Sequence, residues 1–200
     1  MVNKIQDFRA DVQFLRALAV LFVILFHAKI PGMSGGYLGV DIFFVISGFW
    51  MSKILSYEIA KNNFSFKQFY ERRFRRILPA LFVTLLLVFG VAWFELWPKD
   101  FDTMSEVMGS SVLFLANAVI RNQDDDYFQP EMDSHSLLHT WSLSLEEQFY
   151  FIFPVLLVIL YKLPKLFFRV AVLLIPLLSF YSAIYYFEIG QETKAFYHLP

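Results

Sequence analysis

Apolar positions along the chain form five long runs that are separated by shorter polar segments. The runs cover residues 12–30, 36–55, 77–96, 145–160 and 166–187. A bilayer core requires roughly 20 apolar helical residues, and these runs meet or nearly meet that length. Pro154 and Pro176 lie inside the last two runs, where neighbouring helices can satisfy the freed backbone groups. We therefore predict an all-α, polytopic transmembrane helix bundle with about five spans in this chain.

A sixth segment, residues 103–120, has its apolar residues at helical spacing but also contains Glu106 and Asn117, which predicts an amphipathic helix. Charge bias indicates how it lies. Lysine and arginine are concentrated between the second and third runs and between the fourth and fifth, whereas the segment after Arg121 is acidic. All these loops obey the positive-inside rule if residues 103–120 form an interfacial or re-entrant helix. The expected topology is multi-pass with a cytoplasmic N-terminus.

Composition narrows the class of protein. The chain is 58% hydrophobic and contains 25 phenylalanines, which argues against a soluble domain and predicts membrane lipid as a partner. The absence of cysteine excludes disulfides, thiolate metal sites and a cysteine nucleophile within these residues. No basic or acidic tail points to nucleic acid. The first run contains Arg16 and lacks a small-residue cleavage site, so it reads as a retained span and not as a signal peptide.

Arg16 and His27 are ionisable residues within the first apolar run. They are eleven residues apart, which returns to nearly the same helix face about three turns further on. One interpretation is structural: Arg16 snorkels to the inner surface and His27 donates to a carbonyl. The other is functional, because ionisable residues in spans usually face an interior or a water-filled cavity, and histidine suits proton transfer near neutral pH.

The turn after the first run leads to Asp41, about one turn inside the second. We expect His27 and Asp41 at similar depth on adjacent helices, where the carboxylate would fix the imidazole tautomer; the alternative is an aspartate that faces water. Gly32, Ser34 and Gly36 match the pattern G-x-S-x-G. A nucleophile elbow needs a strand before the turn, so we interpret these glycines as permitting tight turning and close approach of the backbone to a ligand.

Four arginines, Arg72, Arg73, Arg75 and Arg76, directly precede the third run. They are consistent with positive-inside anchoring and contact with anionic lipid. Arg73 and Arg76 would also share a helix face and form a fork for phosphate groups. Residue type alone does not separate the two interpretations.

The stretch "HSLLHTWSLSLEEQFYFIFP" leads into the fourth run. His135 and His139 have a spacing that suits zinc on a helix, but spacing implies no third ligand. Glu146 and Glu147 open the expected helix, where the macrodipole favours carboxylates, so capping competes with a functional role. We read Trp141, Tyr150 and the phenylalanines as an aromatic belt. The acidic run at residues 124–126 lacks the glycine and spacing of a calcium loop and reads as solvated surface.

Taken together and in order, these motifs resemble the membrane-bound acyltransferase family 3, whose members O-acetylate bacterial surface polysaccharides and lipopolysaccharide O-antigen. The matching stretches are "FRADVQFLRALAVLFVILFHA", "GGYLGVDIFFVISGF", "FYERRFRRILPAL", "LLHTWSLSLEEQFYFIFP" and "AFYHLP". The resemblance implies an O-acetyltransferase of the bacterial inner membrane, with cytoplasmic acetyl-CoA as cosubstrate, a glycan acceptor outside and no metal. Residues 1–200 would be the N-terminal part of the membrane domain, with further spans and, in some members, an SGNH-type domain beyond it.

The resemblance also assigns residues. It implies His27 as the catalytic histidine of an arginine, ten residues, histidine motif that begins at Arg16, and Asp41 as the acidic position in the second span. The cytoplasmic arginine-x-x-arginine motif falls on Arg73 and Arg76, although Arg72 and Arg75 have the same spacing. The tryptophan-serine-leucine and glutamate motif falls on Trp141, Ser142 and Glu146, with Glu147 beside it. Two rivals stay open on residues alone: a transporter or flippase, and a non-catalytic membrane anchor.

Overall fold

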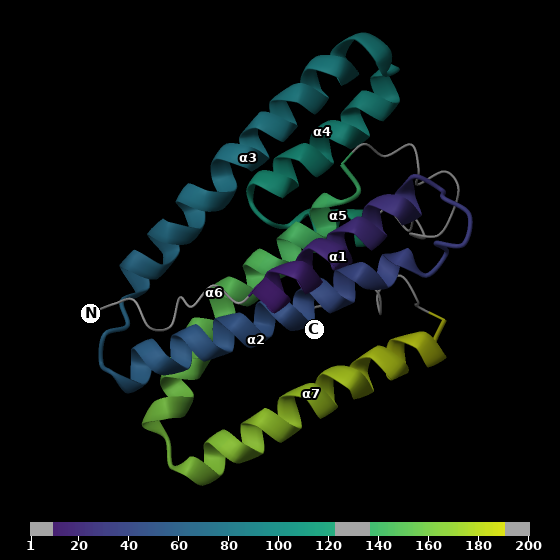
Figure 1. Cartoon of the computed structure of the whole chain (residues 1–200). Coiled ribbons are helices and arrows are strands. Elements are labelled where there is room, and N and C mark those ends of the chain that lie inside the picture. The colour runs from purple at the N-terminus through teal and green to yellow at the C-terminus, as the bar shows by residue number, and fades with distance from the viewer. Residues whose placement is uncertain (1–9, 123–136, 191–200) are drawn as a thin grey trace. The chain divides into compact units, whose positions relative to one another are not determined.

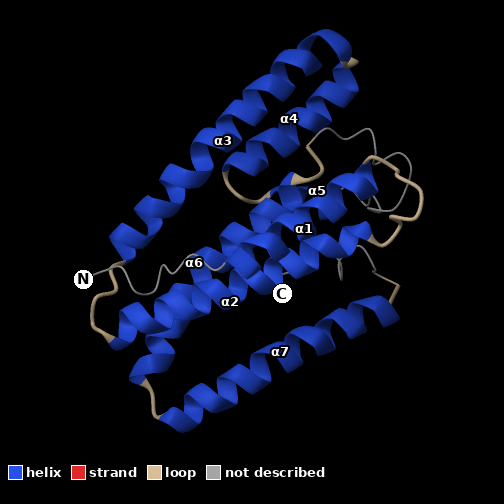
Figure 2. Cartoon of the chain, viewed as in Figure 1, coloured by secondary structure: helices blue, strands red, loops and turns tan. Residues whose placement is uncertain are grey.

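In the computed structural model, which describes residues 10–122 and 137–190, every regular element is a helix. Figure 2 shows these helices in blue and the described loops and turns in tan. The all-α prediction is confirmed. The chain divides into two compact units, Met1–Phe64 and Ser65–Pro200, and each is described by itself.

Five of the described helical segments are long and apolar enough to cross a membrane, as predicted (Figure 1). They are α1 (Ala10–His27), the 3-10 turn η1 (Gly36–Leu38) that continues into α2 (Gly39–Ala60), α3 (Phe66–Glu95), α6 (Thr140–Lys162) and α7 (Lys165–Glu188). α7 has no buried residue, and many large apolar side chains of the other four are exposed as well. Such apolar exteriors suit lipid.

Unit 1 is an antiparallel hairpin of α1 and α2, and the two arms come into close contact at two glycines. A Cβ atom added to Gly36 would collide with the carbonyl oxygen of Phe22, and one added to Gly39 would collide with that of Ala19. The helix backbones therefore touch at these positions, as small residues permit at close helix crossings. The close approach at Gly36 is to the neighbouring helix; an approach of the turn glycines to a ligand stays a prediction. Lys29 and Gly32, both at positive φ, turn the chain between the helices.

In unit 2, α3 is 30 residues long and begins eleven residues before the expected span. At 1.5 Å per residue it measures about 45 Å, which exceeds a hydrocarbon core of about 30 Å. The extra length carries the arginines, so they lie within the helix and not in a loop before it. Pro79 lies in the interior of this helix.

Two helices replace the single amphipathic helix expected over residues 103–120. α4 (Pro98–Val112) runs back beside α3 (Figure 1), and α5 (Ala116–Asn122) follows a break at Phe114, which has a φ of 56°. Their lengths of 15 and 7 residues are short for a bilayer span. The prediction of one continuous helix is wrong, and its interfacial position stays a prediction.

Polar side chains of α6 explain the break, because they take over hydrogen bonds that a continuous helix would make itself. The Gln148 amide nitrogen donates to the Phe114 carbonyl oxygen at 2.7 Å and to Asn117 Oδ1 at 2.8 Å. The Ala116 amide donates to Ser144 Oγ at 3.2 Å. We call this arrangement the elbow; it consists of residues 113–117 and the two α6 side chains that hold them.

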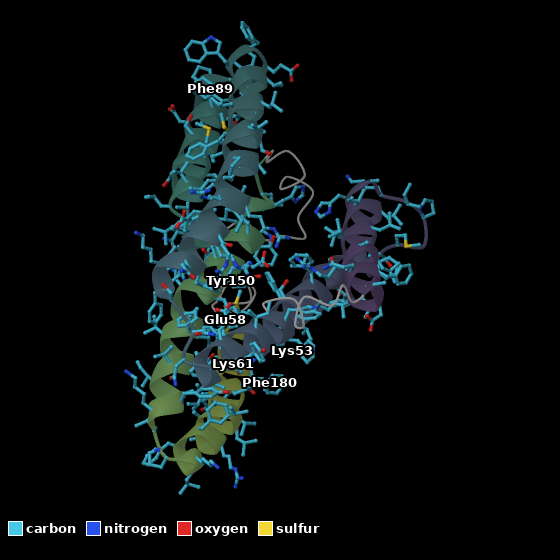
Figure 3. The ribbon with its side chains drawn as sticks, turned by 60° about the vertical axis from the view of Figure 1, so that its left-hand side comes forward. Lys53, Glu58, Lys61, Phe89, Tyr150 and Phe180 are labelled. Atoms are coloured by element: carbon cyan, nitrogen blue, oxygen red, sulfur yellow. The ribbon has the colours of Figure 1, made fainter. Side chains whose placement is uncertain are left out.

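An aromatic cluster closes the turn between α3 and α4. Phe89, Trp93 and Phe101 have ring centroids 5.7 to 5.9 Å apart. Figure 3 shows Phe89 toward the end of α3 that leads to α4, and Tyr150 on α6. The two lie in different parts of unit 2, so the aromatic cluster is separate from the charged residues described next.

Candidate active site

Arg16 lies on the face of α1 that packs against α2. Its guanidinium carbon is 4.9 Å from the centroid of the Phe43 ring, and the buried residues Val12 and Ala19 lie one turn away on either side. The opposite face, including Phe14 and Ile24, is exposed. Helical spacing puts His27 on the same stripe as Arg16 and Ala19. Arg16 and His27 therefore occupy the packed stripe of α1.

His27 is the last residue of α1 and is half-buried. Its Nδ1 lies 2.8 Å from the Val23 carbonyl oxygen, and the edge of the Phe26 ring packs against the imidazole. A carbonyl only accepts, so Nδ1 carries the proton, and Nε2 carries the lone pair when the ring is neutral. This hydrogen bond to a backbone carbonyl is what a purely structural role of His27 predicts. It also fixes the tautomer that a general base needs, so it is compatible with a catalytic role as well.

Asp41 does not lie at the depth of His27. Gly36 packs opposite Phe22 and Phe26, and Gly39 packs opposite Ala19 and Val23. Continuing this register places Asp41 near the level of Ala19, about 12 Å along the axis from His27 at 1.5 Å per residue.

Our expectation of similar depth is therefore wrong, because η1 already packs along α1 and the chain has descended several residues before α2 begins. Asp41 is nearer the level of Arg16 than that of His27, and its side chain is exposed in unit 1.

The arginines of α3 divide between two faces. The guanidinium carbon of Arg73 lies 4.0 Å from the Tyr150 ring centroid and 5.7 Å from that of Phe69. Arg75 points away, where it pairs with Glu71 at 2.8 Å, and its side chain is 80% exposed. Arg73 therefore faces α6. Arg76, one turn further along α3, is exposed, but its charge acts on Glu147 of α6, which favours Arg73 with Arg76 over Arg72 with Arg75 as the pair directed to α6.

Aromatic contacts fix where α3 crosses α6. The Tyr70 hydroxyl donates to the Phe151 carbonyl oxygen at 3.0 Å, and the two rings stack with centroids 5.4 Å apart. Phe74 packs against Phe151 as well. Tyr70 and Phe74 thus contact Phe151, and Arg73 contacts Tyr150. The next turn of α3, which carries Arg76, therefore lies near the turn of α6 that carries Glu147.

Glu146 and Glu147 lie two turns inside α6, because this helix begins at Thr140, five residues earlier than expected. The capping interpretation is therefore wrong. Glu146 accepts a hydrogen bond from the Tyr150 hydroxyl. Trp141 and Tyr150 are buried at 5% and 4% exposure, so they do not form an aromatic belt.

Glu147 is the residue that our reading of the sequence underrated. It is 2% exposed, its Oε1 has no hydrogen-bond partner, and the charges of Arg73, Arg76 and Glu146 act on it. A signal was present in the spacing of α6, whose buried positions recur every three or four residues and include 141, 144, 147, 150, 154 and 157. A glutamate at such a position is a buried charge and calls for a partner.

Within residues 10–122 and 137–190, no group of three or more histidine, aspartate or glutamate residues is arranged to hold a metal ion. His135, the partner of His139 in the zinc alternative, lies outside the described residues. So do the acidic run at residues 124–126 and the "AFYHLP" stretch.

Comparison with known proteins places residues 9–200 in the family described as "Acyltransferase domain". A Haemophilus influenzae protein of uncharacterised function is 37% identical over 79% of this chain and 66% of its own length. A Staphylococcus aureus protein named "Putative O-acetyltransferase SACOL0978" is 36% identical over 90% of this chain and 32% of its own length.

Peptidoglycan O-acetyltransferase OatA of Listeria monocytogenes is 34% identical over 94% of this chain and 30% of its own length. The chain thus spans about a third of the two proteins named as O-acetyltransferases. No solved structure gives a significant match.

Proposed function

Because the chain belongs to acyltransferase family 3, a family of enzymes that transfer acyl groups, we propose that it forms part of an integral membrane O-acetyltransferase. The donor is acetyl-CoA on the cytoplasmic side, and the acceptor is a hydroxyl of an exported cell-envelope glycan. The enzyme resides in the bacterial inner membrane with its N-terminus in the cytoplasm. The observation that carries the proposal is His27, an imidazole held in one tautomer on the packed stripe of a membrane helix.

Arg73 and Arg76 bind the phosphates of acetyl-CoA, and Arg72 contributes from the exposed side of the same turn. Guanidinium groups match phosphate geometry through paired N–H donors. Stacking on the rings of Tyr150 and Phe69 supports this role, since it restricts the Arg73 side chain before a ligand arrives. Glu146 contributes indirectly, because its hydrogen bond holds the Tyr150 ring on which Arg73 rests.

At the reacting centre, His27 has two routes. As a general base, Nε2 takes the proton of the glycan hydroxyl while the hydroxyl oxygen attacks the thioester carbonyl; the C–S bond breaks, and the leaving thiolate receives the proton. As a nucleophile, Nε2 attacks the thioester carbonyl, and the C–S bond breaks to release the CoA thiolate. The glycan hydroxyl then attacks the acetyl group on Nε2, the N–C bond breaks, and the hydroxyl proton passes to the thiolate. Both routes require the proton on Nδ1, where the Val23 carbonyl holds it.

Arg16 shapes the electrostatics of the path between the two substrates. Asp41 lies close to its level in the hairpin. We therefore assign Asp41 to charge stabilisation along the path toward Arg16, and not to direct contact with the His27 ring.

The acceptor belongs to one of two glycan classes. Listeria OatA is named for peptidoglycan, whereas the motif resemblance points to polysaccharide such as lipopolysaccharide O-antigen. In both classes the reacting group is a sugar hydroxyl, so the same chemistry at His27 applies. Mass analysis of both glycans, from cells with and without the intact protein, distinguishes them.

The test of the proposal is His27→Ala in the full-length protein. We expect loss of acetyl groups from the glycan by at least about a hundredfold, because general-base catalysis alone contributes about that much. The matched control is His139→Ala, which removes an exposed histidine at the start of α6 and should retain activity. Full acetylation by membrane-inserted His27→Ala protein contradicts the proposal. Transport of a glycan without acetyl-CoA consumption by the purified protein identifies a flippase instead.

A further inference from the structure

The starting observation is a buried carboxylate with an unsatisfied oxygen. Glu147 is 2% exposed, and its Oε1 has no hydrogen-bond donor. A buried ionised group is unfavourable unless opposite charge or hydrogen bonds compensate for the lost water. A glutamate that served only to fill the α6 interior would be replaced by any apolar residue of similar volume. Its presence therefore requires a reason in the charges around it.

Those charges come from two helices. Arg73 and Arg76 of α3 act on Glu147 as opposite charges, and Glu146 acts as a like charge from the preceding position of α6. The hydroxyl proton of Tyr150 is directed to Glu146, so it does not serve Glu147. The contact of α3 with α6, where Arg73 lies on the Tyr150 ring and Tyr70 bonds to Phe151, brings this end of α3 to the part of α6 that carries Glu147.

These are the same arginines to which the proposed function assigns the donor phosphates, and the present inference rests on that function. We propose that Glu147 is a positioning residue, an internal counter-charge that competes with the phosphates of the donor for Arg73 and Arg76. When the site is empty, the carboxylate partly neutralises the arginine pair. When acetyl-CoA is bound, the phosphates take over this interaction, and after transfer the carboxylate helps CoA to leave.

The physical basis is that like charges repel strongly where water is scarce. A carboxylate within several ångströms of a bound phosphate weakens anion binding more at a buried site than at the surface, because the effective dielectric constant is lower. Glu147 touches no reacting atom in this scheme. It acts on affinity and release through the arginines.

The experiment measures CoA binding and steady-state acetylation by the purified full-length protein in detergent or nanodiscs. Glu147→Gln keeps the shape of the side chain and removes its charge. We expect CoA to bind at least about fivefold more tightly, the KM for acetyl-CoA to fall, and kcat to fall as CoA release slows. A purely structural role would not produce tighter binding together with slower turnover.

The control is Glu71→Gln, which removes the same charge from an exposed position of α3 where Glu71 pairs with Arg75. It should leave CoA affinity within about twofold of wild type, because exposed charges are screened. If Glu147→Gln does not accumulate in the membrane, Glu147→Asp replaces it. Shortening the side chain withdraws the carboxylate from α3, so CoA should then bind about twofold more tightly.

The outcomes separate the two proposals. Unchanged or weaker CoA binding by Glu147→Gln, or by Glu147→Asp where that variant is used, overturns the role of Glu147 and leaves the acetyltransferase assignment intact, provided that the wild type binds CoA. A wild-type protein that binds no CoA overturns both.

Discussion

In unit 1, α1 and α2 pack backbone against backbone at Gly36 and Gly39, whereas in unit 2 the elbow is tied to α6 by amide and hydroxyl side chains. The first contact depends on the absence of side chains. The second depends on polar groups that would be unfavourable in an apolar interior unless each is satisfied. The two units therefore respond differently to substitution: added volume disrupts the hairpin, and lost hydrogen bonds disrupt the elbow.

The difference also bears on function. The hairpin fixes the register that sets the levels of Arg16 and Asp41 along α1, so its geometry controls the proposed path to His27. The elbow holds α4 and α5 against the part of α6 on either side of Glu147, because its hydrogen bonds come from Ser144 and Gln148. Close backbone packing positions the proposed chemistry in one unit, and a hydrogen-bonded network supports the proposed donor site in the other.

Breaking the hairpin should give the largest effect. Gly39→Leu inserts a side chain where even a Cβ atom collides with the Ala19 carbonyl oxygen, so we expect unit 1 to lose at least about 3 kcal/mol of stability. Thermal unfolding and protease resistance of the full-length protein in detergent measure this loss. The matched control is Gly48→Leu in the same helix, since a Cβ atom at Gly48 meets nothing within 4 Å. Equal stability of the two variants would contradict the backbone contact.

Breaking the elbow should have a smaller effect. Gln148→Ala leaves the Phe114 carbonyl and the Asn117 side chain without the donor they share, which costs about 2 kcal/mol for buried groups. The same unfolding measurement applies, and hydrogen exchange should show faster opening of residues 113–117. Gln68→Ala serves as the control, because Gln68 is exposed on α3. An elbow that exchanges no faster in Gln148→Ala than in Gln68→Ala would show that these bonds do not hold it.

The long apolar helices could be predicted from the sequence, because the length and hydrophobicity of each run are enough to identify them. It predicted five spans, and the structure has five helices that qualify among its described residues. The break at Phe114 could not be predicted, because residues 103–120 have unbroken helical periodicity and their bonds to Gln148 and Ser144 join positions about thirty apart. Local pattern carries no information about such distant hydrogen bonds.

The candidate site shows the same limit. Arg16 and His27 were found by periodicity within one helix, and Arg73 by its spacing from Arg76. The depth of Asp41 was misjudged because it depends on how the turn packs, which the glycine contacts decide. The position of Glu146 and Glu147 along the helix was predicted wrongly because α6 begins earlier than its apolar run. Its first turn is polar, and hydropathy therefore places the start too late.

A substitution within the arginine cluster should give the smallest effect. Arg73→Lys retains the charge but loses the planar group that stacks 4.0 Å from the Tyr150 ring centroid. We expect CoA affinity of the full-length protein to fall about fivefold, since stacking and paired N–H donors are lost while the point charge remains. Arg75→Lys, on the exposed face beside Glu71, is the matched control and should change affinity by less than about twofold. If both variants lose affinity equally, phosphate binding does not distinguish the two faces of α3, and the arginines act there as a general positive surface.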